Sequence, residues 1–422
     1  MSDVADRTAA LAGLQLRPLE AGEELDFLRA VSRHFHEDAP DDELQAYLPI
    51  VERARSIVAH DGQGIVGNYA VRTATMSVPG AGPVPCAAVT AVGVAQTHRR
   101  RGLLRAMMVR GLADAQARGD VVAALYASES PIYPRFGFGI SAPQRRYRID
   151  RGAIRFREPV DTRLVEAATV EQALATWPAI LEAAVRARRG GCIDMPPAYW
   201  QGWLGHDPRS ARDGASARRL IHVPGRGYAA YRIKDQFGDG LPAGEVEVDQ
   251  LVASDPEAEQ ALWQHVVDVD LTSTVSSELR PPDDALPWMI TDPLRLRAGD
   301  TSPLYTRLLD VPAALTARTY RAPGAVTLHV HDPLGAANVY RLEVAADGRA
   351  DCTEVVDGAG SDGHAAADIE CSIEALSAVW LGGVRAAQLL AARRLIEHRA
   401  QAVSRFDAML AVDRLPWTPF MF

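Results

Sequence analysis

Residues 92–104 read Val-Gly-Val-Ala-Gln-Thr-His-Arg-Arg-Arg-Gly-Leu-Leu, and this stretch decides our interpretation of the fold. An apolar, strand-forming run ends in a basic turn, and the pattern predicts a helix directly after it. The apolar residues of that helix recur at the spacing of one helical face, at Leu103, Leu104, Met107, Met108, Leu112 and Ala115. Unpaired backbone N–H groups and the helix dipole favour an anion at a helix N-terminus, so the turn is suited to hold a phosphate.

The chemistry of the turn points to a pyrophosphate. Gly102 lets the backbone approach a bulky anion, and Arg99, Arg100 and Arg101 neutralise its charge. The two standard nucleotide loops, G-x-x-x-x-G-K-[ST] and G-x-G-x-x-G, are absent from the sequence. Arg99-x-x-Gly102 instead resembles the coenzyme A loop of the GNAT acetyltransferases, with Leu104 where that pattern has a small residue.

A second stretch makes the resemblance more specific. Residues 127–139 read Ala-Ser-Glu-Ser-Pro-Ile-Tyr-Pro-Arg-Phe-Gly-Phe-Gly. Together with residues 97–105, they resemble the Eis (enhanced intracellular survival) family, a branch of the GNAT enzymes. The likeness is dense over residues 88–140, and Pro134 stands where we expect a glycine. The resemblance implies an N-acetyltransferase that uses acetyl-CoA as its co-substrate and no metal.

Length and composition set the broad class. The chain has 422 residues, which is too long for one ordinary domain, so we expect two or three. Its 47% hydrophobic and 23% charged residues are typical of a soluble globular protein. The net charge of −9 argues against nucleic acid as the main partner. It suits a cationic substrate, although a mildly acidic surface also serves solubility alone.

The cysteines and the lack of targeting signals indicate a cytoplasmic protein. Cys86, Cys192, Cys352 and Cys371 are too scattered for a metal or redox motif, so we interpret them as free thiols in a reducing compartment. The polar start at residues 1–7 does not resemble a signal peptide, and no apolar run reaches the length of a membrane span.

The expected fold is a multidomain α/β and α+β chain. Residues 1–150 have the order of an N-terminal GNAT fold, and residues 151–310 repeat it weakly as a second, degenerate GNAT-like domain. Residues 311–422 form an α+β domain that looks like the sterol-carrier-like module of the Eis family. The second domain has only Ala-Ser-Asp-Pro between its expected strand and helix, so we do not expect it to bind coenzyme A.

Hydrophobic periodicity gives the expected elements of each domain. In the first domain we expect helices at 23–36 and 41–53, strands at 56–60, 64–76 and 84–94, a helix ending at residue 119 and a strand ending at residue 127. In the second we expect helices at 168–188 and 256–267 and strands at 219–222, 227–233, 244–252 and 271–275. In the third we expect strands at 326–331, 337–344, 349–353 and 367–369 and helices at 372–380, 385–390 and 391–397.

The resemblance divides the coenzyme A contacts between a strand and a loop. The strand residues Val92, Gly93 and Val94 are expected to hold the pantetheine and acetyl end, and a backbone N–H near Val94 to polarise the thioester carbonyl. The expected pyrophosphate and neighbouring contacts are Arg99, Arg100, Arg101, Gly102, Leu103, Leu104, Arg105, Ser128 and Glu129.

Tyr133 is the candidate general acid. A phenol, with its high pKa, can give a proton to a leaving thiolate, and Tyr133 follows the second strand of the site. A tyrosine that only packs explains the position equally well, and Tyr126 is the competing phenol; the family match favours Tyr133. Ser128 does not indicate a hydrolase, because no G-x-S-x-G is present.

The general base is implied by the resemblance, not by a local motif. In the Eis family the base is the terminal carboxylate, which here belongs to Phe422 in the aromatic, uncharged tail at 417–422. A tail docked only for stability and a base at His98 remain alternatives. Met421 stands where family members often carry an acidic residue, which removes a charge that would attract cationic amines.

Contacts to the acceptor amine are expected in the helical region 23–53. Its acidic and aromatic residues suit a polycationic amine, although a solvated helix connection explains them without function; they are Phe27, Phe35, Glu37, Asp38, Asp41 and Asp42. The spacings His34-x-His36 and His329-x-His331 look like metal ligands, but no cysteine or third histidine lies near either in sequence, so we interpret both as incidental.

These observations favour an acetyl-CoA-dependent N-acetyltransferase that acts on primary amines of aminoglycoside-like or lysine-type acceptors. A non-catalytic sensor of acyl-CoA or lipid on the same scaffold is the alternative. Transfer to a hydroxyl, or of a longer acyl group, would differ only in the shape of the pocket. The family resemblance implies a homohexamer.

Overall fold

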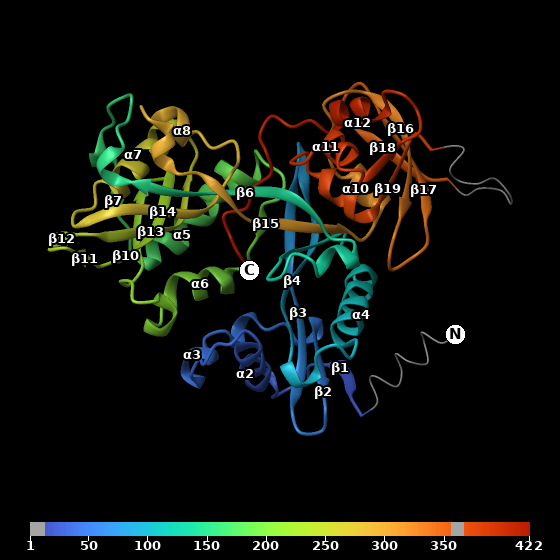
Figure 1. Cartoon of the computed structure of the whole chain (residues 1–422), viewed down its shortest axis with the longest axis horizontal. Coiled ribbons are helices and arrows are strands. Elements are labelled where there is room, and N and C mark those ends of the chain that lie inside the picture. Colours follow the sequence, from blue (N-terminus) through green and yellow to red (C-terminus); the bar gives the residue numbers. More distant parts are fainter. Residues whose placement is uncertain (1–12, 356–366) are drawn as a thin grey trace.

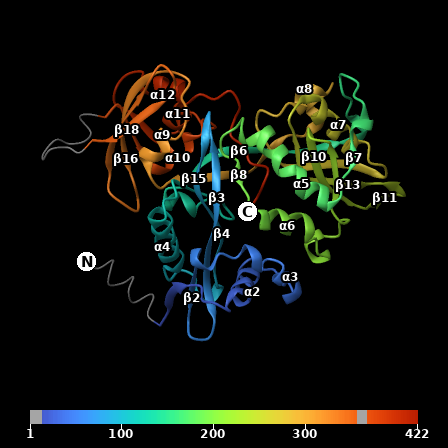
Figure 2. The ribbon, with the colours of Figure 1, turned by 180° about the vertical axis from the view of Figure 1, so that it is seen from behind.

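The computed structural model describes residues 13–355 and 367–422. It has three bodies, of which the first two share one sheet and the third has its own (Figure 1). The polar start at residues 1–7, on which the expectation of no signal peptide rests, lies outside the described residues. Within the described ranges, no helix has the length and apolarity needed to cross a bilayer. The chain ends near the centre of the molecule, close to β3 (Ile65–Val78), β4 (Ala81–Val94) and α6 (Pro197–Gly205), in the front view and in the view from behind (Figures 1 and 2).

The first domain has the predicted elements in the predicted order, and two further strands, at 15–18 and 139–150, were not predicted. Its elements are β1 (Gln15–Pro18), α2 (Glu24–His34), α3 (Asp41–Gln45), β2 (Ser56–His60), β3 (Ile65–Val78), β4 (Ala81–Val94), α4 (Leu103–Ala117), β5 (Val122–Tyr126) and β6 (Gly139–Asp150). The predicted helix at 41–53 is wrong beyond Gln45, where two single 3-10 turns follow, Leu48–Ile50 and Arg53–Arg55. Pro49 explains the break, because it lacks the N–H that a continuing helix needs.

The apolar face of α4 packs as its spacing predicts. Leu103, Met107, Met108 and Leu112 are all at most 3% exposed and belong to one core cluster with β2, β3 and β5. Burying these four side chains fixes the start of the helix beside the end of β4, because Leu103 is itself the first helical residue.

The second domain continues the same sheet. Its elements are β7 (Glu166–Ala167), α5 (Val170–Leu181), β8 (Ile193–Asp194), α6 (Pro197–Gly205), β9 (Arg219–Val223), β10 (Gly227–Lys234), β11 (Phe237–Gly238), β12 (Leu241–Pro242), β13 (Gly244–Ala253), α7 (Pro256–Val267), β14 (Thr272–Arg280), α8 (Leu286–Met289) and β15 (Gly299–Leu308). The sheet order is β1-β2-β3-β4-β5-β15-β6-β14-β13-β10-β9-β7, with β8 on β3. The two GNAT-like units therefore share one sheet, because β15 of the second returns to pair with β5 of the first.

The unit β13-α7-β14 repeats the parallel arrangement of β4-α4-β5, but its helix start differs. Asp255 caps α7 by accepting a hydrogen bond from Ala258 N at 3.0 Å, and its carboxylate binds Arg226 at 2.6 Å. A carboxylate thus occupies the helix N-terminus where a phosphate would lie, in keeping with the expectation that this copy binds no coenzyme A.

The third domain is an α+β body with a separate five-stranded sheet. Its elements are α9 (Val311–Thr316), β16 (Gly324–His331), β17 (Asn338–Val344), β18 (Ala350–Glu354), β19 (Ile369–Ser372), α10 (Ile373–Trp380), α11 (Ala386–Ala391), β20 (Leu395–Glu397) and α12 (Ala402–Leu410). The predicted helix at 391–397 is wrong. Arg393 has a φ of 58°, which ends the helix, and residues 395–397 pair with β19 as a strand.

Candidate active site

The site is built where β4 and β5 separate. The two strands pair in parallel only at Cys86–Val122, Ala87–Ala123 and Ala88–Ala124. Beyond these pairs each strand keeps only its outer neighbour, β3 for β4 and β15 for β5. The gap contains a cavity of about 350 Å³, which is lined by residues 89–92 of β4 and 125–128 at the end of β5. Two strands that part in this way leave backbone N–H and C=O groups facing the gap, where a ligand can pair with them.

A bulge in β4 shapes one wall of this cavity. The register shifts between Asn68 and Ala70, and Ala91 has a φ of 50°, a left-handed conformation that costs free energy in a residue with a side chain. The buried side chain of Asn68 holds the bulge, because its Nδ2 donates to the Ala91 carbonyl at 2.5 Å while its Oδ1 is hydrogen-bonded to the His34 ring. Burial lowers the pKa of His34.

Gly93 lies in the bulge for a packing reason. A Cβ atom there would lie 2.9 Å from His34 Cβ and 3.2 Å from Asn68 Oδ1. Gly93 therefore lets α2 press against β4, and the paired strand residues Gly93 and Val94 face β3 at Asn68 and Gly67. Of the three strand residues predicted to hold the pantetheine, Val92 lines the cavity and Gly93 and Val94 do not.

The basic turn lies open at the start of α4. Arg100 and Gly102 have φ values of 63° and 81°, and the helix has no side-chain cap. Arg99, Arg101, Arg100 and Arg105 are all exposed, and within the described residues none of them forms an ion pair. Four unneutralised cations around an uncapped helix N-terminus fit a pyrophosphate, which supports the use of this turn for coenzyme A.

Tyr133 lies at the opposite wall of the cavity. It begins a 3-10 turn at Tyr133–Phe136 and is 4% exposed. Burial raises the pKa of Tyr133, and a hydrogen bond with Ser128 partly offsets that shift. Ser128, Tyr133 and Val92 line the same cavity, whereas Glu129 is exposed and does not.

Tyr126 is the competing phenol, and its hydroxyl is already engaged. Gln144 Nε2 donates to Tyr126 Oη at 2.6 Å, and burial raises the pKa of Tyr126 strongly. Its ring meets the ring of Phe422 edge to face at 5.6 Å between centroids. Tyr126 thus contacts the end of the chain through Phe422. The hydrogen bond from Gln144 goes to Tyr126 and not to Tyr133.

The C-terminal tail reaches the cavity from the third domain. After α12 it runs along the second domain. There the Leu415 N–H donates to Asp283 Oδ2 at 3.0 Å, and the Leu415 carbonyl accepts from Arg189 Nη1 at 2.8 Å. It then ends beside β5, and Met421 and Phe422 line the cavity between β4 and β5. A base at the end of the chain would therefore lie in the same cavity as Tyr133.

Aromatic packing fixes the last turn of the tail. Phe420 is 1% exposed and meets three rings edge to face, at centroid distances of 5.2 Å to Trp200, 6.0 Å to Tyr199 and 6.3 Å to Trp203. Tyr199 also donates its hydroxyl to the Met421 carbonyl at 2.9 Å. These contacts come from α6, which was not predicted, and they hold the chain end in place.

A larger cavity of about 700 Å³ adjoins the first, because Phe35, Thr90 and Ala91 line both. It lies between α2, α3 and the strands β3 and β4, and its acidic residues are Glu37, Asp38, Glu43 and Glu52. Of the predicted acceptor contacts, those that line it are Phe27, Phe35, Glu37 and Asp38. Asp41 and Asp42 do not, and Asp41 is bound to Arg29 at 2.9 Å.

His98 lies apart from both cavities. Its Nε2 is 3.7 Å from Asp61 Oδ2, and its ring accepts or donates a hydrogen bond at 2.8 Å with Thr97 Oγ1. This position gives His98 no access to the gap between β4 and β5. No local pattern predicts the pairing of His34 with Asn68, which are 34 residues apart in the sequence. Glu43 and Glu52 lie within the expected acceptor region 23–53, but they were not among the predicted contacts.

Comparisons with known proteins agree with this architecture. Residues 15–141 and residues 191–308 each match the acetyltransferase (GNAT) domain family, and residues 311–419 match the sterol carrier protein domain family. The predicted fold class is thereby confirmed for all three domains. A GCN5-related N-acetyltransferase from Kribbella flavida, at 22% identity and a TM-score of 0.74, shares the fold over 97% of this chain and 100% of its own.

Closer relatives cover almost the whole chain. An uncharacterized N-acetyltransferase of Streptomyces coelicolor is 38% identical over 91% of this chain and 93% of its own. The N-acetyltransferase Eis of Mycobacterium tuberculosis is 32% identical over 89% of this chain and 92% of its own. The crystal structure of Eis1 from Mycobacterium abscessus superposes with a TM-score of 0.80 at 31% identity, over 97% of this chain and 100% of its own.

The open turn generates a prediction about coenzyme A affinity. Replacing Arg99 and Arg101 together by alanine removes two cations from an uncapped helix start, so we expect the dissociation constant of coenzyme A to rise at least about tenfold, since a hydrogen bond to a charged group contributes about 1.5–3 kcal/mol. Isothermal titration calorimetry at low and high salt measures this dissociation constant. Its dependence on salt concentration should be weaker in the double variant than in the wild type.

Arg118→Ala is the matched control, because Arg118 follows α4 at the end away from the turn, where its side chain donates to the Ala54 carbonyl. An equal loss of affinity in the control, or none in the double variant, would show that the turn does not bind the pyrophosphate.

Proposed function

The chain belongs to the Eis family of GNAT acetyltransferases, and from this premise we propose that it transfers the acetyl group of acetyl-CoA to primary amines of aminoglycoside-like or lysine-type acceptors. One observation supports this most directly: Tyr133, the β4 bulge and Phe422 line a single cavity. Because the family consists of N-acetyltransferases, a non-catalytic sensor is not retained as an alternative.

Coenzyme A would lie across the open turn with its pantetheine in the gap between β4 and β5. The arginines and the N-terminus of α4 bind the pyrophosphate, and the separated strands offer backbone groups to the pantetheine amides. A backbone N–H of the bulge near Ala91 and Val92 polarises the thioester carbonyl. The expected donor near Val94 stays a candidate, because the Ala95 N–H donates to the Val66 carbonyl on β3 and the N–H of Val94, one residue earlier, points to the opposite edge of β4.

Tyr133 acts as the general acid. The acceptor nitrogen forms a bond to the acetyl carbon, the C–S bond breaks, and the Tyr133 hydroxyl gives its proton to the leaving sulfur. The raised pKa of Tyr133 keeps this proton on the phenol at neutral pH, so the acid is in its working form before each turnover. Tyr126 is the competing acid, because its oxygen accepts the hydrogen bond from Gln144 Nε2 and its own proton is not used in that bond; the family resemblance favours Tyr133.

The terminal carboxylate of Phe422 acts as the general base. It accepts the proton that the amine loses, directly or through one water, and the aromatic contacts of Phe420 and Tyr199 keep it beside the donor. Proton loss at the amine and proton gain at the sulfur then balance over one turnover, with Tyr133 reprotonated from solvent.

The larger cavity would receive the acceptor. Its carboxylates at Glu37 and Asp38 form no ion pair within the described residues, so they remain available to an ammonium group. Phe27 and Phe35 supply aromatic surface for the body of the acceptor. The shared lining at Thr90 and Ala91 places this cavity next to the donor gap.

The assembly and location follow the family resemblance. We propose a homohexamer in the cytoplasm, where the four buried free cysteines would stay reduced.

Tyr133→Phe tests the acid. The substitution keeps the packed ring and removes the proton, so we expect kcat to fall about 10²–10⁴-fold with little change in coenzyme A affinity. Release of the free thiol from acetyl-CoA over a panel of polyamines, aminoglycosides and lysyl peptides is the measurement. In the wild type, activity should persist to a pH above the ordinary tyrosine pKa of about 10 before it declines, because the Tyr133 pKa is raised.

Tyr126→Phe is the matched control for Tyr133→Phe. It removes the hydroxyl that binds Gln144 but should keep most of kcat. Activity retained in Tyr133→Phe and lost in Tyr126→Phe would assign the acid to Tyr126, and no turnover by the wild type with any amine would contradict the proposed function.

Extension of the tail tests the base. Two glycines added after Phe422 leave the side chains of the tail unchanged and move the carboxylate out of its place, so we expect kcat to fall about 100-fold while the coenzyme A affinity is unchanged. Steady-state kinetics and coenzyme A titration separate the two quantities. Met421→Leu, which keeps the carboxylate at Phe422, is the control, and full activity of the extended chain would contradict a role for the carboxylate.

A further inference from the structure

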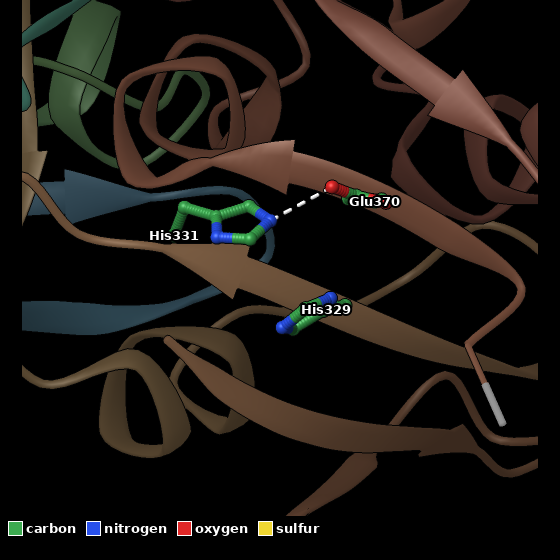
Figure 3. Close-up of side chains that lie close together, drawn as sticks. All are labelled: His329, His331 and Glu370. Carbon is green, nitrogen blue, oxygen red and sulfur yellow. Dashed lines mark hydrogen bonds and ion pairs between the residues drawn. The ribbon is translucent and has the colours of Figure 1, made fainter. Parts of the chain in front are cut away.

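A cluster of histidines and a carboxylate lies on the sheet of the third domain, apart from the acetyl-transfer site. His329 and His331 are two residues apart on β16 and therefore project from the same face of the strand. Glu370 lies on the neighbouring parallel strand β19, where it is paired in register with His329. Figure 3 shows His329 and His331 on one strand and Glu370 on the next, with the ring of His331 directed at the Glu370 carboxylate.

The distances within the cluster are short. His331 Nε2 lies 2.8 Å from Glu370 Oε1, and the rings of His329 and His331 are 4.4 Å apart between centroids. One ligand atom from each of His329, His331 and Glu370 can be chosen so that all three lie within 4.8 Å of one another. Metal–ligand distances of about 2.0–2.2 Å put the ligand atoms of a tetrahedral site roughly 3.3–3.5 Å apart, so small side-chain rotations would close this cluster around an ion.

A third histidine supports the carboxylate from outside the triad. His398 follows β20, and its Nε2 lies 2.9 Å from Glu370 Oε2, whereas His331 Nε2 lies 2.8 Å from Oε1. Outer partners of this kind fix the orientation of a ligating carboxylate and contribute to metal affinity. His398 is 67 residues from His331 in sequence, counted from the residue numbers, which is why the spacing His329-x-His331 alone looks incidental.

Burial and access differ across the cluster in a way that suits an ion. His329 is 8% exposed, which limits its rotation, whereas the side chain of His331 is 46% exposed and leaves a path from solvent. Two imidazoles and one carboxylate are the ligand types that Zn²⁺ and related late transition-metal ions prefer, whereas Mg²⁺ and Ca²⁺ prefer oxygen ligands.

We propose that His329, His331 and Glu370 bind a divalent transition-metal ion of the Zn²⁺ class, with His398 orienting Glu370 and water completing the coordination. The ion would join β16 to β19 and has no part in acetyl transfer, because none of its ligands lines the cavities of the first domain. A cluster held only by hydrogen bonds between imidazole and carboxylate is the alternative, and the two differ in metal affinity.

The test uses the full chain without an affinity tag, stripped with a chelator and titrated with Zn²⁺ against a chromophoric competitor. We expect one equivalent to bind, and Co²⁺ in its place to give the visible absorption of a low-coordinate nitrogen and oxygen site. Glu370→Gln and His329→Gln should each abolish the binding of this equivalent of Zn²⁺. His398→Gln should lower the Zn²⁺ affinity about 10–100-fold. Mg²⁺ should not compete.

His36→Gln is the matched control, because His36 belongs to the other His-x-His pattern, at His34, and is exposed. It should bind Zn²⁺ like the wild type. Absence of a stoichiometric equivalent in the wild type, or unchanged affinity in Glu370→Gln and His329→Gln, would overturn the proposal. If a variant does not fold, anomalous diffraction from Zn²⁺-soaked wild-type crystals decides: a peak between β16 and β19 supports the site, and a peak elsewhere or none overturns it.

Discussion

The separation of β4 from β5 after Ala88 is the constraint on which the rest of the structure depends. Each strand is held on its outer edge, β4 by β3 and β5 by β15, so the inner edges are left to a ligand. The same separation puts the end of β4 beside the start of α4 and the end of β5 beside Tyr133. Tyr133 and Phe422 line one cavity because these two strands part.

The second GNAT-like unit has the same parallel topology as the first but a different helix start. The strands β13 and β14 run parallel around α7 as β4 and β5 do around α4, but Asp255 caps α7 and neutralises Arg226. A helix start that holds a carboxylate repels a phosphate, whereas the start of α4 has four exposed arginines and no cap. The second unit contributes β15 to the sheet and α6 to the contacts that hold the tail beside β5.

Local patterns were sufficient for the strand, turn and helix at 84–119, because β-propensity, arginine content and helical spacing all lie within one short segment. They were less sufficient in the second and third domains, where α6, β15 and α12 were not predicted and the expected helix at 391–397 is in part a strand. The return of β15 to β5, the bulge at Ala91 held by Asn68, and the strand at 395–397 depend on contacts between distant segments, and no periodicity encodes them. The tail was expected in the first domain only through the family resemblance, since nothing near Phe422 indicates its partner.

The central claim is that the gap between β4 and β5 holds the reacting thioester between the Ala91 bulge and Tyr133. A crystal structure of the enzyme with coenzyme A tests it most directly. We expect the pyrophosphate on the N-terminus of α4, the pantetheine between the two strands and the sulfur within hydrogen-bond distance of Tyr133 Oη. A sulfur beside Tyr126 and out of reach of Tyr133, or coenzyme A between β13 and β14, would contradict it.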